Sequence, residues 1–141
     1  MKIPVFLAAL LATTGFAIAC SCAPSPGVAE SLKDSAAVFA GKVLSISPSG
    51  DDPEAAMSGF KITFAVEKSW KGIRTEKVVI ATSPGGGMCG YHFEKEGRYL
   101  VYASGDKELS TGICSRTAPL DEAAGDVAQL DKLAKSAPSQ R

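Results

Sequence analysis

The sequence predicts a small, mainly β domain: a five-stranded closed barrel with a short helix near each end, held together by disulfides. Three observations lead to this fold class. A leader at the N-terminus leaves room for one domain, and five short segments rich in alternating or β-branched residues are separated by Pro and Gly turns. The chain also has four cysteines, an even number that fits complete pairing in an exported protein.

Residues 1–19 have the organisation of a cleavable signal peptide. Lys2 supplies the positive charge, residues 3–17 form an interrupted apolar run, and Ala17-Ile18-Ala19 is a small-residue cleavage pattern. A membrane-spanning helix needs about 20 apolar residues, which this run does not reach. We therefore expect a secreted or periplasmic protein that begins at Cys20, with one domain over 20–136 and a disordered tail over 137–141.

The composition argues against several classes of function. Fifteen basic and fifteen acidic residues balance, so no charge excess favours binding to nucleic acid or to an anionic membrane. The aromatic residues are therefore expected to pack in the core rather than to stack on bases. His92 is the one histidine, and no pair of acidic residues has a telling spacing, so we expect no enzymatic activity.

The first half of the domain begins with an arm and a helix. Two prolines in residues 23–27 exclude regular structure, which predicts an extended arm. A short helix is expected over Val28–Ser35, followed by a strand over Ala36–Ser47 with both faces partly apolar, as in a barrel wall. Residues 48–59 combine prolines, glycines and acidic residues, which indicates a solvated loop.

Four further strands are predicted, over Phe60–Trp70, Lys77–Thr82, Tyr99–Ala103 and Glu108–Cys114. Asp121 is expected to cap a C-terminal helix that runs to about Lys135, with lysines in its last turns. Five short strands with a helix near each end fit an OB-fold, the best-known five-stranded barrel. We expect the protein to be a monomer.

The spacing of the cysteines restricts their pairing. They are Cys20, Cys22, Cys89 and Cys114. A bridge between the first two would close a very small, strained ring, so two long-range pairings remain open. Each long-range bridge would stabilise the fold by about 4 to 5 kcal/mol in the chain-entropy model. A structural zinc site is the competing interpretation, and the lack of a C-x-x-C pair argues against it.

Several short motifs together resemble those of a known family. They are Cys20-x-Cys22 at the predicted mature N-terminus, Lys68-Ser69-Trp70-Lys71-Gly72, Met88-Cys89-Gly90-Tyr91, and Gly112-Ile113-Cys114 ahead of Ala118-Pro119. Their order and spacing resemble the tissue inhibitors of metalloproteinases and the wider netrin-like module across almost the whole mature chain. The resemblance implies an OB-like barrel with disulfides Cys20–Cys89 and Cys22–Cys114.

The resemblance also implies a function. In these inhibitors the N-terminal amine and carbonyl of the first cysteine bind the catalytic zinc of a partner metalloprotease. If the roles of the family apply to this chain, Cys20 would bind that zinc and Ser21 would enter the specificity pocket. The resemblance implies no cofactor of the chain's own. The arm would continue along the cleft through Cys22, Ala23 and Pro24. A neighbouring ridge would consist of Met88 and Cys89.

Two alternatives remain at this point. Netrin-like modules also occur in proteins that inhibit nothing, so a non-inhibitory extracytoplasmic binding or structural module is one of them. The other is a lipoprotein, because Ala17-Ile18-Ala19-Cys20 resembles a bacterial lipobox in which the thiol of Cys20 receives lipid and anchors the chain to a membrane. A lipidated Cys20 could not form a disulfide and would leave Cys89 unpaired.

Overall fold

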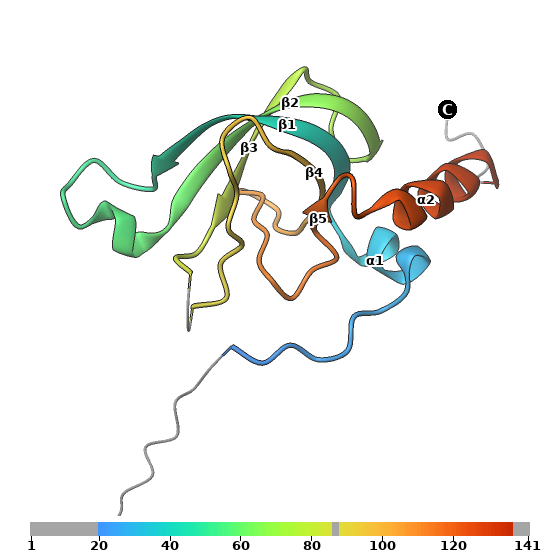
Figure 1. Cartoon of the computed structure of the whole chain (residues 1–141), viewed down its shortest axis with the longest axis horizontal. Helices are drawn as coiled ribbons and strands as arrows, with labels where there is room; N and C mark the ends of the chain where they lie inside the picture. Colours follow the sequence, from blue (N-terminus) through green and yellow to red (C-terminus); the bar gives the residue numbers. More distant parts are fainter. Residues whose placement is uncertain (1–19, 86–87, 137–141) are drawn as a thin grey trace, which may run out of the picture.

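The computed structural model describes residues 20–85 and 88–136, so the predicted signal peptide and C-terminal tail lie outside the described residues. The chain forms a mainly β fold with two α-helices and a short 3₁₀ turn (Figure 1). In chain order the elements are α1 (Val28–Asp34), β1 (Ala37–Pro48), η1 (Ala55–Ser58), β2 (Phe60–Lys71), β3 (Lys77–Thr82), β4 (Arg98–Ala103), β5 (Ala118–Pro119) and α2 (Ala124–Ser136).

The five strands form one antiparallel sheet in the order β3-β2-β1-β4-β5. The long central strands β1 and β2 pair over their whole lengths, but their register shifts at three places along β1. Bulges of this kind increase the local twist and bend the sheet. Gly41 lies at one of them, where a Cβ atom would come within 2.7 Å of the Ala65 carbonyl oxygen. The strands therefore curl around the core, as Figure 1 shows.

The prediction of a closed barrel is wrong. In the described part of the chain, the edge strands β3 and β5 do not pair with each other. The predicted fifth strand, Glu108–Cys114, makes only isolated bridges: Ser110 to Ala81 and to Ser104, and Gly112 to Gly90. Because this segment crosses from the end of β4 to β3 instead of running along either strand, it cannot extend a ladder. The fifth strand is instead the two-residue β5.

The C-terminal helix begins later than predicted. Asp121 lies in a turn, where Glu122 and Ala123 donate backbone hydrogen bonds to Pro119 and Leu120, and α2 starts only at Ala124. Asp121 is therefore not the N-cap, because the turns that follow β5 occupy its position. The predicted N-terminal helix is confirmed within one residue by α1.

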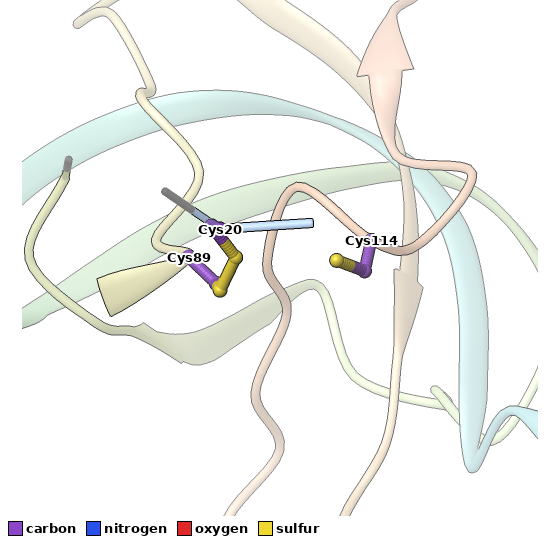
Figure 2. Close-up of side chains that lie close together, drawn as sticks. All are labelled: Cys20, Cys89 and Cys114. Atoms are coloured by element: carbon purple, nitrogen blue, oxygen red, sulfur yellow. A yellow bond between two sulfur atoms is a disulfide. The ribbon is translucent and has the colours of Figure 1, made fainter. Parts of the chain in front are cut away.

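Two disulfides join the N-terminal arm to two loops of the body. Cys20 pairs with Cys89 and Cys22 with Cys114, at Cα–Cα distances of 5.5 and 5.1 Å. Figure 2 shows Cys20 and Cys89 bonded, with Cys114 close by. The prediction of a fold held by disulfides is confirmed, and the pairing is the one that the family resemblance implies.

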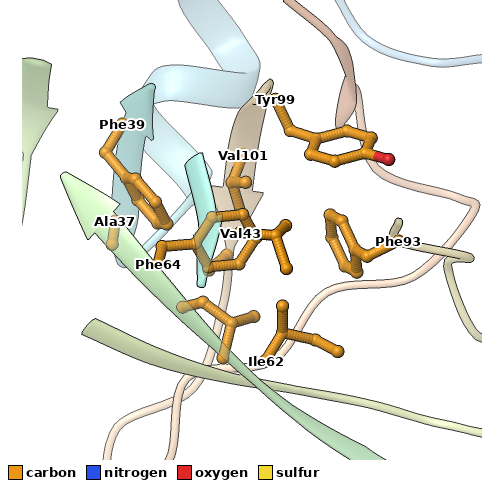
Figure 3. Packing of buried hydrophobic residues seen from close by; sticks show 10 residues of the cluster. Ala37, Phe39, Val43, Ile62, Phe64, Phe93, Tyr99 and Val101 are labelled. Carbon is orange, nitrogen blue, oxygen red and sulfur yellow. The ribbon is translucent and has the colours of Figure 1, made fainter. Parts of the chain in front are cut away.

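The core divides into two clusters because β1 has two apolar faces. One face packs inside the curl of the sheet, where Phe64 contacts the rings of Phe39 and Phe93 edge to face, each at a centroid distance of 5.3 Å (Figure 3). The other face lies under the two helices, where Val38 and Leu100 are fully buried beside Leu130 of α2. The helices thus cover the outer face of the sheet, and α1 connects the N-terminal arm to the start of β1.

Candidate functional site

The N-terminal arm, residues 20–27, is an exposed segment without regular structure that leads into α1. Cys20 is half-buried, whereas Ser21, Cys22, Ala23 and Pro24 are exposed. The last three of these residues, predicted to lie along a partner's cleft, are therefore accessible along one continuous stretch. In the described part of the chain, Ser21, Ala23 and Pro24 make no hydrogen bond, so their polar backbone groups are accessible.

The loop that carries Met88 and Cys89 lies against the arm through the Cys20–Cys89 disulfide. Cys89 has a left-handed backbone with φ of 62°, and its carbonyl accepts a hydrogen bond from Ile113 at 3.0 Å. Gly90 follows where the chain passes very close to Ser83: a Cβ there would lie 1.7 Å from the Ser83 carbonyl oxygen. Only glycine fits this approach, so Gly90 sets the position of the ridge.

The structure brings most of the predicted contact residues together. We call Cys20, Ser21, Cys22, Met88 and Cys89 the arm–ridge surface, because the disulfide places the two segments side by side. Met88 leaves 60% of its surface exposed, and Ile113, which sequence reasoning did not identify, leaves 45% exposed beside the second disulfide. Met88 and Ile113 are thus exposed apolar side chains close to the two disulfides of the arm.

A side-chain network holds the far end of the arm. The Arg116 guanidinium donates to both carboxylate oxygens of Asp126, at 2.8 and 2.6 Å, and to the carbonyl of Pro26 at 3.1 Å. Tyr102 donates its hydroxyl to Asp126 at 3.0 Å, and Ser31 donates to the same Pro26 carbonyl. We call these five residues the arm clamp. It connects the arm, β4 and α2 at one point.

The charges of the clamp stabilise each other. The hydrogen bonds from Arg116 lower the pKa of the Asp126 carboxyl below its ordinary value, against the opposing effect of burial. Burial, with the nearby Asp126 charge, raises the pKa of the Tyr102 hydroxyl. Asp126 therefore stays ionised and Tyr102 stays a donor across the physiological range. Sequence reasoning did not find this clamp, because ten residues separate Arg116 from Asp126 and no local pattern links them.

The sulfur atoms meet in one place but do not form a metal site. The Sγ atoms of Cys20, Cys89 and Cys114 all lie within 4.8 Å of one another (Figure 2). Both disulfides consume them, and among the described residues no cysteine is free. Because zinc binds thiolates and not disulfide sulfurs, the oxidised cluster offers no metal ligands. His92 is exposed on the loop before β4.

Between residues 20 and 136, leaving aside 86 and 87, no helix is long and apolar enough to cross a membrane. The disulfides are compatible with an oxidising, extracytoplasmic location. Comparison with the models of known protein families finds no match, and comparison with curated proteins finds none either. The resemblance to the metalloproteinase inhibitors therefore rests on the cysteine positions and the short motifs quoted above.

Proposed function

We propose that the exported protein inhibits zinc metalloproteases through the N-terminal amine and carbonyl of Cys20. The observation that carries this proposal is the disulfide between Cys20 and Cys89, which fixes the predicted first residue beside an exposed ridge. Ser21, Ala23 and Pro24, which follow it, are exposed and make no hydrogen bond in the described part of the chain. An arm held in this way presents a backbone, rather than a side-chain pocket, to its partner.

The chemistry requires a free amine at Cys20. A catalytic zinc keeps three protein ligands and one exchangeable position, which a neutral amine together with a carbonyl can occupy in place of water. Signal-peptide cleavage after Ala19 would create that amine. An α-amino group titrates at about pH 8, and its protonated form cannot bind a metal. Inhibition should therefore weaken as the pH falls from 8 to 6.

The tethers of the arm favour tight binding. Two disulfides and the arm clamp hold the arm at Cys20, Cys22 and Pro26 before a partner arrives. Ordering a flexible segment costs free energy on association, and an arm that is already held avoids much of this cost. In the bound state Ser21 would enter the specificity pocket, and Met88 would contact the rim of the cleft.

The same disulfide supports an unlipidated Cys20. A lipid thioether would occupy the Cys20 sulfur, and this sulfur is bonded to Cys89. The five-stranded antiparallel sheet with a helix near each end also supports the likeness to the netrin-like module. Both observations favour the inhibitor over the membrane-anchored alternative.

The test compares two forms of the oxidised protein, one beginning at Cys20 and one with a single alanine added before Cys20. The added residue converts the amine to an amide, so we expect at least about a 100-fold weaker inhibition, corresponding to about 3 kcal/mol of lost zinc binding. Inhibition constants would be measured on a panel of zinc endopeptidases at pH 8. Equal melting temperatures and identical disulfide maps would show that the extension leaves the fold intact.

Equal inhibition by both forms would overturn the chelation mechanism. Inhibition by neither form would contradict the proposed function and favour the non-inhibitory binding module. A serine protease serves as the control enzyme, since it has no zinc for Cys20 to bind.

A further inference from the structure

The two disulfides are neighbours in space although they close separate loops. Their partners are 69 and 92 residues apart in the sequence. The Cys114 sulfur nevertheless lies within 4.8 Å of the sulfurs of both Cys20 and Cys89. Figure 2 shows the three side chains close together. The Cys22 sulfur is bonded to Cys114 but does not lie within 4.8 Å of both Cys20 and Cys89. A thiolate formed at Cys114 would thus start next to an intact disulfide.

The two disulfides differ in their exposure. Cys22 and Cys114 are both exposed, whereas Cys20 and Cys89 are half-buried. Thiol–disulfide exchange needs access of the attacking thiolate to a sulfur, so an external reductant reaches Cys22–Cys114 first. The reduction that occurs first therefore creates the thiolate at Cys114.

We infer that the two disulfides form a thiol-exchange relay in which one two-electron reduction frees the N-terminal arm from both tethers. A dithiol attacks Cys22–Cys114 and becomes a cyclic disulfide, leaving a Cys22 thiol and a Cys114 thiolate. Rotation of the freed Cys114 side chain lets this thiolate attack the Cys89 sulfur. A Cys89–Cys114 bond forms, the Cys20–Cys89 bond breaks, and Cys20 leaves as a thiolate that takes a proton from water.

The backbone around Cys89 and Cys114 favours this product. Ile113, the neighbour of Cys114, donates a hydrogen bond to the Cys89 carbonyl at 3.0 Å, and Gly90 bridges Gly112. The new disulfide therefore joins two loops that are already held together, which costs little loop-closure entropy. The arm meanwhile gains conformational freedom, because both of its cysteines become free thiols.

The released arm keeps the contacts at its far end, where Pro26 accepts from Arg116 and Ser31, and Gly27 accepts from the Ser31 backbone N–H. Residues 20–25 lose their fixed position relative to Met88 and Cys89. If the proposed function holds, the same reduction abolishes inhibition while the body of the protein stays cross-linked. The relay itself does not depend on that function.

The substitution Cys22→Ser tests the relay without any reductant. It leaves Cys114 as a thiol beside Cys20–Cys89, and we expect most of the purified protein to contain a Cys89–Cys114 disulfide and a free Cys20. Peptide mapping after alkylation at low pH identifies the bonds. The matched variant Cys114→Ser leaves the free thiol at Cys22, whose sulfur does not lie within 4.8 Å of both Cys20 and Cys89, and should retain Cys20–Cys89. A Cys22→Ser protein that keeps Cys20–Cys89 and a free Cys114 would overturn the relay.

A second experiment uses the unaltered protein, so that a folding defect of the variant cannot decide the matter. The oxidised protein is treated with one equivalent of dithiothreitol at pH 8, quenched with N-ethylmaleimide, and mapped. We expect the protein molecules that carry two N-ethylmaleimide labels to have them on Cys20 and Cys22. Labels on Cys22 and Cys114 would refute the relay. Neither map involves a protease, so failure of the relay and failure of inhibition are seen separately.

Discussion

Replacing Asp126 by asparagine should destabilise the fold through the arm clamp. Asp126 accepts two hydrogen bonds from Arg116, at 2.6 and 2.8 Å, and one from Tyr102 at 3.0 Å. The side chains of Arg116 and Asp126 are only 27% and 16% exposed, so water replaces these bonds incompletely. Asparagine keeps the size of the side chain but removes its charge and one acceptor oxygen, which leaves Arg116 without a counter-charge.

The expected loss of stability follows from this partial burial. A hydrogen bond to a charged group contributes about 1.5 to 3 kcal/mol, and breaking a fully buried pair costs about 3 to 5 kcal/mol. Because Arg116 keeps more than a quarter of its exposure, we expect about 2 kcal/mol at pH 7. For a domain of this size the melting temperature should fall by about 8 °C.

The pH dependence of this loss has a definite sign. Arg116 lowers the pKa of folded Asp126 from its ordinary value of 3.8, so the unfolded chain binds a proton more readily than the folded one. The contribution of Asp126 to the free energy of unfolding is complete above pH 3.8 and is lost as the pH falls through the lowered folded pKa. Urea unfolding at pH 7, 5 and 3 should therefore show the two proteins differing most at pH 7 and 5.

The matched control is Glu96→Gln, which removes an ion pair with Lys42 whose two side chains are 60% and 42% exposed. Exposed pairs contribute little, so its unfolding curve should overlay that of the unaltered protein. An Asp126→Asn protein as stable as the unaltered one at pH 7 would refute this reasoning. So would a stability difference that persists unchanged at the acidic end of the series.

Two further predictions concern Gly90 and Tyr91, the residues that follow the ridge. Gly90→Ala should lower the free energy of unfolding in urea by about 2 to 3 kcal/mol, since its methyl group would clash with the Ser83 carbonyl. The control Gly85→Ala has open space around it and should leave stability unchanged. Equal effects of the two substitutions would contradict the role of the close approach at Gly90. Burial raises the pKa of Tyr91 to about 12, so stability should fall as the pH rises from about 10 to 12. Tyr91→Phe should remove part of this fall, and an unchanged alkaline profile would show that Tyr91 does not cause it.

Most strands could be predicted because their own residues define two faces. The alternation Phe60, Ile62, Phe64 along β2 places every second side chain toward the core, and β2 and β3 match the predicted ranges to within one residue. In β1 both faces are apolar, which the structure explains by the two clusters on its opposite sides. Local alternation was enough for these elements because each strand pairs along its full length.

The prediction of a fifth strand was wrong because contacts with distant residues, and not the local pattern, decide the path of this segment. Residues 108–114 have strand-like composition, but the disulfide from Cys114 to the arm and the close approach of Gly112 to Cys89 direct the segment from the end of β4 to β3. Those constraints come from residues more than twenty positions away. No pattern within the segment indicates these constraints. The sequence therefore predicted a closed barrel, whereas the sheet of the described residues is open.

The spacing of the two arm cysteines explains why the predicted contact residues gather where they do. In an extended segment, alternate side chains point to opposite sides. Cys20 and Cys22 both bond to loops of the body, so the side chain between them is directed away from it, and Ser21 is accordingly exposed. The same Cys-x-Cys spacing therefore anchors the backbone twice and leaves the Ser21 side chain accessible. If the proposed function holds, the affinity depends on the anchored amine of Cys20, and the choice among proteases depends on Ser21.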